Sequence, residues 1–413
     1  HVRSRRQRQM CIRDRLDTAR LRNKAILIKG ARVFRLEKLV QRLQAQQHET
    51  TLQVDLHKLG QNLKYFRSQI ESKTKIMVMV KAFSYGSGGF EVANYLQNQN
   101  VDYLAVAYAD EGVSLRKRGV RLPIMVMSPS KTSYDAVIRH QLEPEIYSLR
   151  SLKEFIESAA SSRHLFHELN IHLKIDSGMH RLGFESRDVP ELLELLNQAP
   201  FIRVASVFTH LSAVDSEDQD EFTKQQIERY QHLAAAIQLG LNYQVMNHVL
   251  NSTGVLRFPL YHFDMVRIGI GLYGFAGTDS SKFLQALGAF KSYIIQIRTV
   301  APNESVGYSR AGASDKERRI ATIAVGYADG LDRRLGHGEW SLKWQGQACP
   351  IVGNVCMDMC MIDVTHYEAK EGDEIMIFEG ADDVSAMAKK LGTIPYEILT
   401  KVSQRVSRVY LQE

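Results

Sequence analysis

The sequence IMVMVKAFSYG, residues 76–86, is the stretch on which the fold assignment depends. Its apolar, β-branched start predicts a buried strand that ends at a lysine and a turn. Similar short runs recur as far as residue 268, with amphipathic helical patterns between most of them. The expected strands are Ile76–Val80, Tyr103–Ala107, Ile124–Met127, Pro144–Tyr147, Ile171–Ile175, Arg203–Thr209, Gln244–His248 and Phe263–Ile268. This alternation predicts an α/β fold, a (β/α)8 barrel of the TIM type, although periodicity alone leaves an open doubly wound sheet as an alternative.

After Gly274 the pattern changes to strand-like runs joined by Gly, Asn and Asp turns, with few helices. The runs are Ser292–Val300, Ile320–Val325, Ala348–Val352, Met359–Val364 and Glu374–Phe378, and a last helical turn is expected near Pro395–Thr400. A chain of 413 residues is also too long for one ordinary core. We therefore expect a basic N-terminal extension (1–50), a barrel (51–285) and a mainly β C-terminal domain (286–413).

Composition places the chain among soluble proteins. It is 44% hydrophobic and 24% charged, and no signal peptide is recognisable. No apolar run reaches the roughly 18–20 residues that a membrane span needs. The cysteines, Cys11, Cys349, Cys356 and Cys360, are too few for a disulfide framework, so we expect reduced thiols in a cytoplasmic protein. No metal site is expected.

The net charge of +7 comes from the start of the chain. Residues 1–50 contain 14 of the 53 Lys and Arg but only 4 of the 46 Asp and Glu, so the rest is mildly acidic. A basic arm can bind nucleic acid or a membrane surface, but no aromatic interleaving or zinc pattern accompanies this one, and we expect neither partner. The chain begins at His1 rather than Met, as expected of a fragment, and the arm predicts proteolytic sensitivity before residue 50.

Cationic and polar residues fall where the expected strands end. They are Lys81, Lys174, Arg181, His210, Ser252 and Arg267. In a barrel the carboxyl ends of all strands meet at one rim, where such enzymes build their active sites. A lone histidine is more often a core residue and a lone arginine a salt-bridge partner, but together these side chains predict a pocket for an anionic, phosphorylated ligand. A desolvated Lys81 would have the lowered pKa that a Schiff-base lysine needs, and Gly269-Ile270-Gly271 would offer N–H groups to a phosphate.

At these residues the chain resembles alanine racemases, over about residues 50–413. The matching barrel motifs are Lys81-Ala-x-x-Tyr85-Gly, Lys174-Ile-Asp-Ser-Gly-Met-x-Arg181-Leu-Gly-Phe, Thr209-His210, Asn251-Ser252 and Arg267-Ile-Gly-Ile-Gly-Leu-Tyr-Gly. Those of the second domain are Val306-Gly307-Tyr308-Ser309, Gly326-Tyr327-Ala-Asp329-Gly, Val355-Cys356-Met357-Asp358 and Pro395-Tyr396-Glu.

The resemblance implies an isomerase that interconverts L-alanine and D-alanine and supplies D-alanine for peptidoglycan. It implies a homodimer in which the partner's β domain completes each barrel. Lys81 would form the internal aldimine with pyridoxal 5′-phosphate, and Lys81 and Tyr308 of the partner subunit would be the catalytic bases on opposite faces of the substrate Cα. The implied cofactor-binding residues are Lys81, Tyr85, His210, Asn251, Ser252, Arg267, Gly269, Ile270 and Tyr396.

The resemblance also implies roles around the cofactor. Arg267 would face the pyridine nitrogen, and because a guanidinium does not give up its proton, that nitrogen would stay unprotonated and transamination would be suppressed. His210 would pack on the cofactor ring. The implied substrate-binding residues are Arg181, Met357 and Asp358, and the supporting residues are Tyr327 and Lys174, which in the family is often a carbamate.

The chain departs from the usual family motifs at a few positions, and other functions stay open. Phe83 stands where the family usually has Asn or Asp, Ser87 where it usually has His, and His180 where Gly is common, but none of these removes a catalytic group. A pyridoxal-phosphate decarboxylase of basic amino acids would place a carboxylate where this chain has Arg267. A cofactor-carrying homeostasis protein built on the same barrel would lack the second domain. A racemase of serine or of several amino acids stays open.

The extension carries a second resemblance. Ile28-Lys29-Gly30-Ala31-Arg32, followed by a Leu- and Glu-rich helical pattern, is similar to the end of a Mur ligase, the UDP-N-acetylmuramoyl-tripeptide–D-alanyl-D-alanine ligase. The similar segment covers about residues 25–48. It implies that the chain is the C-terminal part of a ligase–racemase fusion.

Overall fold

The computed structural model describes residues 50–412 apart from 166 and 278–281. These residues form two compact units, one of residues 58–287 and one that combines residues 50–57 with 288–412. The ligase-like segment at about residues 25–48 lies outside the described residues.

Among the described residues, the larger unit contains a sheet of eight strands. They are β2 (Lys75–Met79), β3 (Tyr103–Val106), β4 (Ile124–Val126), β5 (Glu143–Ile146), β6 (Leu169–Lys174), β7 (Ile202–Phe208), β8 (Met246–His248) and β9 (Met265–Ile268). Each pair of neighbours in the order β8-β7-β6-β5-β4-β3-β2-β9 is parallel. β9 also lies beside the end of β8, since the Arg267 N–H donates to the Leu250 carbonyl at 3.0 Å. The sheet therefore nearly closes on itself, and the predicted barrel is confirmed.

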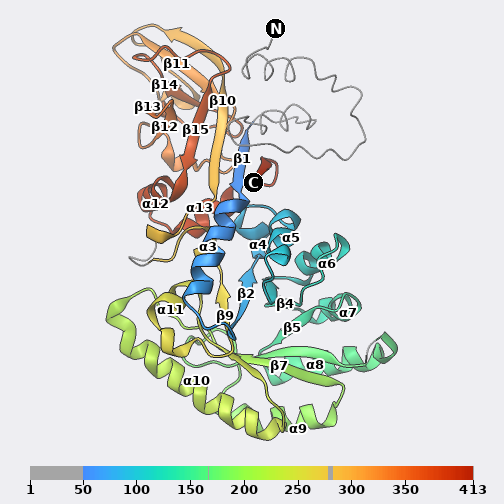
Figure 1. Ribbon diagram of the computed structural model, residues 1–413. Coiled ribbons are helices and arrows are strands. Elements are labelled where there is room, and N and C mark those ends of the chain that lie inside the picture. The colour runs from blue at the N-terminus through green and yellow to red at the C-terminus, as the bar shows by residue number, and fades with distance from the viewer. Residues whose placement is uncertain (1–49, 166, 278–281, 413) are drawn as a thin grey trace, which may run out of the picture. The chain divides into compact units, whose positions relative to one another are not determined.

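Helices lie outside these strands (Figure 1). They are α3 (Leu56–Ser68), α5 (Phe90–Asn98), α6 (Ala109–Lys117), α7 (Tyr134–Arg139), α8 (Leu149–Ser161), α9 (Val189–Gln198), α10 (Asp220–Leu241) and α11 (Ser252–Arg257). In α10 the buried residues Ile227, Tyr230, Ala234 and Ile237 recur at helical spacing, and the Tyr230 hydroxyl donates to the Val207 carbonyl of β7 at 2.8 Å. Burial of each large apolar side chain stabilises such packing by about 1.5–3 kcal/mol. No helix among the described residues is long and apolar enough to cross a membrane.

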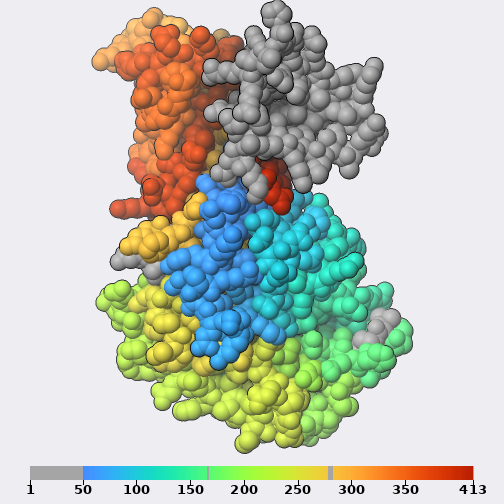
Figure 2. All heavy atoms as spheres, viewed as in Figure 1, coloured from blue at the N-terminus to red at the C-terminus, as the bar shows by residue number. Residues whose placement is uncertain are grey.

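The first barrel helix and the last barrel segment are joined by a buried asparagine. The Asn62 amide on α3 donates to the Leu272 carbonyl at 2.9 Å and to the Gln285 carbonyl at 2.7 Å, and its oxygen accepts the Gln285 N–H at 2.8 Å. In Figure 2 the blue atoms of α3 lie directly beside the yellow atoms that follow β9. Segments more than 200 residues apart thus complete the unit, since Asn62 satisfies backbone groups that burial would otherwise leave unpaired.

The second unit is mainly β, as predicted. Its strands are β1 (Thr51–Asp55), β10 (Gly288–Val300), β11 (Arg318–Ile323), β12 (Ser341–Trp344), β13 (Gln347–Pro350), β14 (Cys360–Asp363), β15 (Glu374–Glu379) and β16 (Ser407–Leu411). They follow the order β13-β12-β15-β10-β1-β16, with β11 pairing β10 and β14 pairing β11. The first half of the long strand β10 pairs with β1 and β15, and its second half pairs with β11. A register shift between Ile294 and Gln296 lies where the pairing with β11 begins. Helices α12 (Gly380–Leu391) and α13 (Pro395–Lys401) follow β15.

One strand, β1, belongs to a different unit from the one expected from the sequence. Residues 51–55 were expected to begin the barrel, but β1 pairs antiparallel with β10 and parallel with β16. All of its partners lie in the β unit, and the described chain divides at residues 58 and 288. The local sequence does not indicate this pairing, because the strands that pair with β1 come more than 230 residues later.

Candidate active site

Lys81 begins a turn of unusual backbone shape at the carboxyl end of β2. Within α4 (Lys81–Tyr85), residues Ala82–Tyr85 have φ angles of 50–56°, a left-handed conformation that costs L-residues about 1–2 kcal/mol each. The turn is held in part by Glu111 of α6, whose Oε1 accepts the Ala82 N–H at 2.7 Å. Backbone strain that the surroundings maintain is typical of functional sites. Sequence analysis missed Glu111, since a glutamate at a helix start is usually a solvated residue.

The Lys81 amine lies in an environment that favours its neutral form. Burial lowers its pKa, and the positive charges of Arg181 and Lys174 lower it further, while Glu111 acts in the opposite direction. A neutral amine is what a Schiff-base lysine or a general base requires. The structure therefore gives Lys81 the electrostatic setting that the sequence predicted.

The predicted phosphate-binding residues of the barrel come together. Ser252 Oγ accepts the N–H groups of Gly269 at 2.8 Å and Gly271 at 3.2 Å. A Cβ added at Gly269 would lie 2.8 Å from the Tyr85 hydroxyl, and one added at Gly271 would lie 2.7 Å from the Ser252 Cβ. Asn251 caps α11 by accepting the Gly254 N–H at 2.9 Å. Gly269 and Gly271 thus let the backbone on either side of Ile270 pack closely against Tyr85 and Ser252, and the hydroxyl of Ser252 accepts both glycine N–H groups at this end of the barrel.

Arg267 of β9 is buried, and both terminal nitrogens of its guanidinium are hydrogen-bonded. Its guanidinium donates to His248 Nδ1 at 2.8 Å and to the carbonyls of Thr209, Val249 and His248 at 2.8, 3.0 and 3.1 Å. Burial lowers its pKa to about 10, which still leaves it charged at neutral pH. The guanidinium is thus a fixed cation with a fixed orientation.

A chain of buried hydrogen bonds extends from Arg267 across the barrel interior. His248 Nε2 lies 2.8 Å from Ser206 Oγ, which lies 2.6 Å from His172 Nδ1, and His172 Nε2 lies 2.9 Å from Glu143 Oε2. Because a guanidinium only donates, His248 must accept through Nδ1 and carry its proton on Nε2. Burial and the charge of Arg267 hold the pKa of His248 well below its usual range, so it stays neutral. Sequence analysis identified Arg267 but none of the groups that hold it.

Lys174, at the end of β6, forms a buried ion pair. Its Nζ donates to Glu145 Oε1 of β5 at 2.9 Å. Burial raises the pKa of the Glu145 carboxyl, whereas the positive charges of Lys174, Arg267 and Arg181 oppose that rise. Glu145 was not predicted as a site residue, because a carboxylate within a short strand resembles a solvent-facing position.

His210 follows β7 and remains neutral. Burial lowers its pKa to about 3, and the charges of Arg267, Arg181, Lys174 and Lys81 act in the same direction. A neutral imidazole here can pack against a ring or accept a hydrogen bond without adding to the positive charge of the rim.

The predicted site residues of the β unit are exposed. The side chains of Tyr308, Met357, Tyr327 and Tyr396 are 70%, 54%, 43% and 40% exposed, and Asp358 is exposed as well. Tyr308 begins the short helix η10 (Tyr308–Arg310), and Tyr396, predicted to contact the phosphate, lies on α13. Large side chains that one unit leaves exposed are typical of a surface that a binding partner covers.

The backbone beneath these side chains is firmly held. The Tyr327 N–H donates to the Cys356 carbonyl and the Ala328 N–H to the Met357 carbonyl, both at 3.0 Å. Arg405 joins Asp329 at 2.7 Å to Asp358 at 2.8 Å. The structure therefore brings Tyr327, Met357 and Asp358 together, and Arg405 is a supporting residue that sequence analysis missed.

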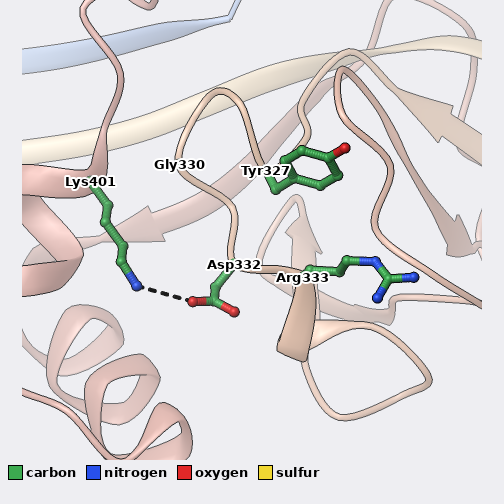
Figure 3. Close-up of a pocket in the computed structure, with 5 residues that line it drawn as sticks. All are labelled: Tyr327, Gly330, Asp332, Arg333 and Lys401. Atoms are coloured by element: carbon green, nitrogen blue, oxygen red, sulfur yellow. Dashed lines mark hydrogen bonds and ion pairs between the residues drawn. The ribbon is translucent and has the colours of Figure 1, made fainter.

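A pocket of about 660 Å³ lies beside Tyr327 in the β unit and is lined by Tyr327, Gly330, Asp332, Arg333 and Lys401 (Figure 3). Lys401 Nζ lies 3.1 Å from Asp332 Oδ2, and contacts with Arg334 and Lys401 lower the pKa of that carboxyl. Arg333 also donates to Asn354 Oδ1 at 3.0 Å, and the Asn354 amide donates to the Tyr308 carbonyl at 3.1 Å. Asn354, another residue missed in the sequence, thus links Tyr308 to this pocket.

Comparison with known proteins gives consistent matches over both units. The family described as "Alanine racemase, N-terminal domain" matches residues 54–277, and "Alanine racemase, C-terminal domain" matches residues 288–410. Alanine racemase 2 of Caldanaerobacter subterraneus subsp. tengcongensis is 36% identical over 377 residues, which are 88% of this chain and 95% of that protein. Alanine racemase 1 of Oceanobacillus iheyensis is 34% identical and matches 87% of this chain and 97% of its own length.

Solved structures agree with the sequence matches. The alanine racemase of Clostridium difficile 630 superposes with a TM-score of 0.82 at 33% identity, covering 88% of this chain and 96% of that one. The alanine racemase of Bacillus anthracis, solved with bound L-Ala-P, superposes with a TM-score of 0.82 at 28% identity, covering 88% and 95%. The matched residues include both described units.

Proposed function

The chain belongs to the alanine racemase family, and from this premise we propose that it interconverts L-alanine and D-alanine with pyridoxal 5′-phosphate as its cofactor. The observation that carries the proposal is the barrel rim, where the partly buried Lys81 amine of lowered pKa and the Gly269–Gly271 turn, bonded to the Ser252 hydroxyl, follow the neighbouring strands β2 and β9. A lysine for the aldehyde and a cradle for the phosphate are the two groups that this cofactor needs.

The chain's residues fit that cofactor. The hydroxyl groups of Tyr85 and Ser252 lie against the backbone of Gly269 and Gly271, where no Cβ would fit, and can serve a phosphate there. Arg267 offers a permanently charged donor for the pyridine nitrogen, and a neutral His210 suits the ring face. When bound, pyridoxal phosphate supplies an electron sink that acidifies the proton on the substrate's α-carbon.

Racemisation requires acid–base groups on both faces of that carbon. We propose that Lys81 Nζ exchanges the proton on one face and the Tyr308 hydroxyl exchanges it on the other. Arg267 retains its own proton, because even a pKa of about 10 lies far above neutral pH. The exposure of Tyr308, Met357 and Tyr327 supports a homodimer in which a second copy contributes Tyr308. Arg181, Met357 and Asp358 are the proposed substrate-binding residues.

Two further parts of the proposal concern the cellular setting. We infer that the enzyme works in the cytoplasm and supplies D-alanine for peptidoglycan. From the resemblance of about residues 25–48, we infer that the start of the chain is the tail of a Mur ligase. Limited trypsin digestion should remove this basic arm before about residue 50 and leave racemase activity intact, whereas a resistant arm would argue for a folded ligase remnant.

The function is tested by an absorbance spectrum and by alanine turnover on the wild type, on Lys81→Ala and on the exposed control Lys73→Ala. We expect a cofactor band and D-alanine formation in the wild type and the control, and loss of both in Lys81→Ala. A cofactor band with serine turnover but no alanine turnover would mean that the substrate is serine instead of alanine. A wild type that shows no band after pyridoxal phosphate is added would overturn the proposal.

A further inference from the structure

Glu145 is a buried acid that the proposed reaction does not use. It lies on β5 with a side chain that is 0% exposed, and its Oε1 accepts from Lys174 Nζ at 2.9 Å. Within the described residues its other oxygen, Oε2, has no hydrogen-bond partner. Burying a carboxylate oxygen without a donor is unfavourable, so a side chain kept in this state requires a functional reason.

The surroundings of Glu145 are cationic and belong to the proposed active site. Burial raises the pKa of the Glu145 carboxyl, and the positive charges of Lys174, Arg267 and Arg181 oppose that rise by stabilising its negative form. Glu145 in turn is one of the two acids, with Glu111, whose charge acts on the Lys81 amine. Its carboxylate is therefore the counter-charge for several cations that meet at the rim.

The contacts of Lys174 suit a positively charged side chain. It donates to Glu145, and its Nζ lies 5.7 Å from the centre of the Phe208 ring, a contact that favours a cation. A carbamate on the same nitrogen would keep a single N–H to donate to Glu145, but it would lose the ammonium charge and place a second buried negative charge close to this carboxylate. The carbamate implied by the family resemblance is therefore disfavoured in this chain.

Lys174 also fixes the loop that carries Arg181. The Lys174 carbonyl accepts the Phe184 N–H at 2.8 Å, and the Phe184 carbonyl accepts the Asp176 N–H at 3.1 Å. The loop between them is tightened by Asp176 Oδ1, which accepts the N–H groups of Gly178, Met179 and His180 at 2.9–3.1 Å. Arg181 thus emerges from a short loop whose two ends are tied to Lys174.

We propose that Glu145 is a positioning residue that supplies the negative charge of this site as a permanent side chain, with Lys174 uncarbamylated, and so orients Arg181 for the substrate. The proposal rests on the proposed racemase function for its kinetic consequences. Its statement about Lys174 does not depend on activity.

The first experiment examines Lys174 directly in the full-length holoenzyme. The wild type is equilibrated with ¹³C-labelled bicarbonate, and carbamate carbon is sought by NMR, with Lys174→Ala as the reference for assignment. We expect no carbamate signal on Lys174. A signal in the wild type that disappears in Lys174→Ala would overturn the proposal, whether or not the enzyme racemises alanine.

The second experiment replaces the negative charge of Glu145 with that of a carbamate on Lys174. Glu145→Ala removes the partner of the Lys174 ammonium group, which can then lose a proton to solvent; the neutral Nζ attacks the carbon of CO2 and releases a second proton, leaving a carbamate in place of the lost carboxylate. We expect bicarbonate to raise the alanine turnover of Glu145→Ala and to produce the NMR signal, but to do neither in the wild type or in Glu145→Ala/Lys174→Ala. Bicarbonate activation of the wild type would overturn the proposal.

Glu145→Gln provides the variant that keeps the shape and removes only the charge. We expect KM for alanine to rise about 10- to 100-fold, with a smaller change in kcat, because a charged hydrogen-bond partner of the site is lost. The exposed Glu157→Gln, which also faces a lysine, serves as the matched control and should leave both constants unchanged. Unchanged constants in Glu145→Gln would overturn the positioning role, whereas an inactive wild type with an intact cofactor band would indicate failure of the proposed function instead.

Discussion

The barrel rim and the exposed face of the β unit carry proposed site residues in opposite physical states. On the rim, Arg267, Ser252 and Lys174 are almost fully buried, and each already has its polar partners within the barrel. On the β unit, Tyr308 and Met357 are more than half exposed, although the backbone beneath them is held by hydrogen bonds. The rim is preorganised by its own fold, whereas the β face offers side chains that become useful only when another surface meets them.

The sharpest test of this contrast removes one hydroxyl from the β face. Tyr308→Phe should lower racemisation about 10²- to 10⁴-fold, because one of the two acid–base groups is lost. Its free energy of unfolding should stay within about 0.5 kcal/mol of the wild type, because the hydroxyl is exposed. Alanine turnover and urea unfolding check the two parts, with Tyr367→Phe in the same unit as the control.

Mixing variants shows whether the two regions meet across a dimer. Neither Lys81→Ala nor Tyr308→Phe should be appreciably active alone, but subunit exchange between them should restore roughly a quarter of the wild-type activity, since about half of all dimers are then mixed and each mixed dimer has one intact site of its two. If activity did not recover although subunit exchange was demonstrated, both bases would belong to the same chain. The proposed sharing of one site between two subunits would then be wrong.

The next largest effect is expected on the stability of the rim. Arg267→Ala should lower the free energy of unfolding by about 3–5 kcal/mol, because His248 and several buried carbonyls lose their donor. Arg203→Ala, whose side chain is about half exposed, should change it by no more than about 0.5 kcal/mol. Equal losses in the two variants would contradict the idea that the rim is held by its own buried network.

The same contrast explains what the sequence could predict. The barrel strands follow local apolar runs, and their order and type were predicted correctly because burial on both faces leaves a clear pattern. No strand was expected at residues 51–55, which were placed in the barrel, because the pairing of β1 with β10 and β16 depends on distant sequence. The left-handed turn at Ala82–Tyr85 has no glycine to signal it.

The supporting residues were harder to predict than the site residues. Lys81, Arg267 and Tyr308 stand out because they lie in specific motifs, but Glu145 and His172 resemble ordinary strand residues. Their roles exist only because β5 and β6 are neighbours, which aligns Glu145 with His172 in the sheet. Arg405 likewise acquires a role only when the fold brings Asp329 and Asp358 to it.

A smaller effect should appear as a pH dependence of the rim. The folded pKa of His210 is about 3, below its ordinary value of 6.5, so the neutral form stabilises the fold. That contribution is complete above pH 6.5 and is lost as the pH falls towards 3, by about 1.4 kcal/mol per pH unit. Unfolding measured at pH 7.5 and 5.5 should therefore show a smaller acid loss in His210→Gln than in the wild type. His232→Gln, on the exposed face of α10, should behave like the wild type, and an unchanged slope in His210→Gln would contradict a neutral, partly buried His210.

The smallest expected effect distinguishes exposed charge from buried charge within the β unit itself. Arg405 bonds two aspartates, of which Asp358 is 56% exposed and Asp329 fully buried. Asp358→Asn should change the free energy of unfolding by about 0–1 kcal/mol, and less in high salt, because an exposed ion pair is screened. Asp329→Asn should cost about 2–3 kcal/mol, since the same arginine then loses a charged partner in a buried setting. If Asp358→Asn were the more destabilising of the two, the exposed face would contribute to the stability of its own unit. Its side chains would then no longer be free to serve a second subunit, and the reason for expecting a shared active site would be lost.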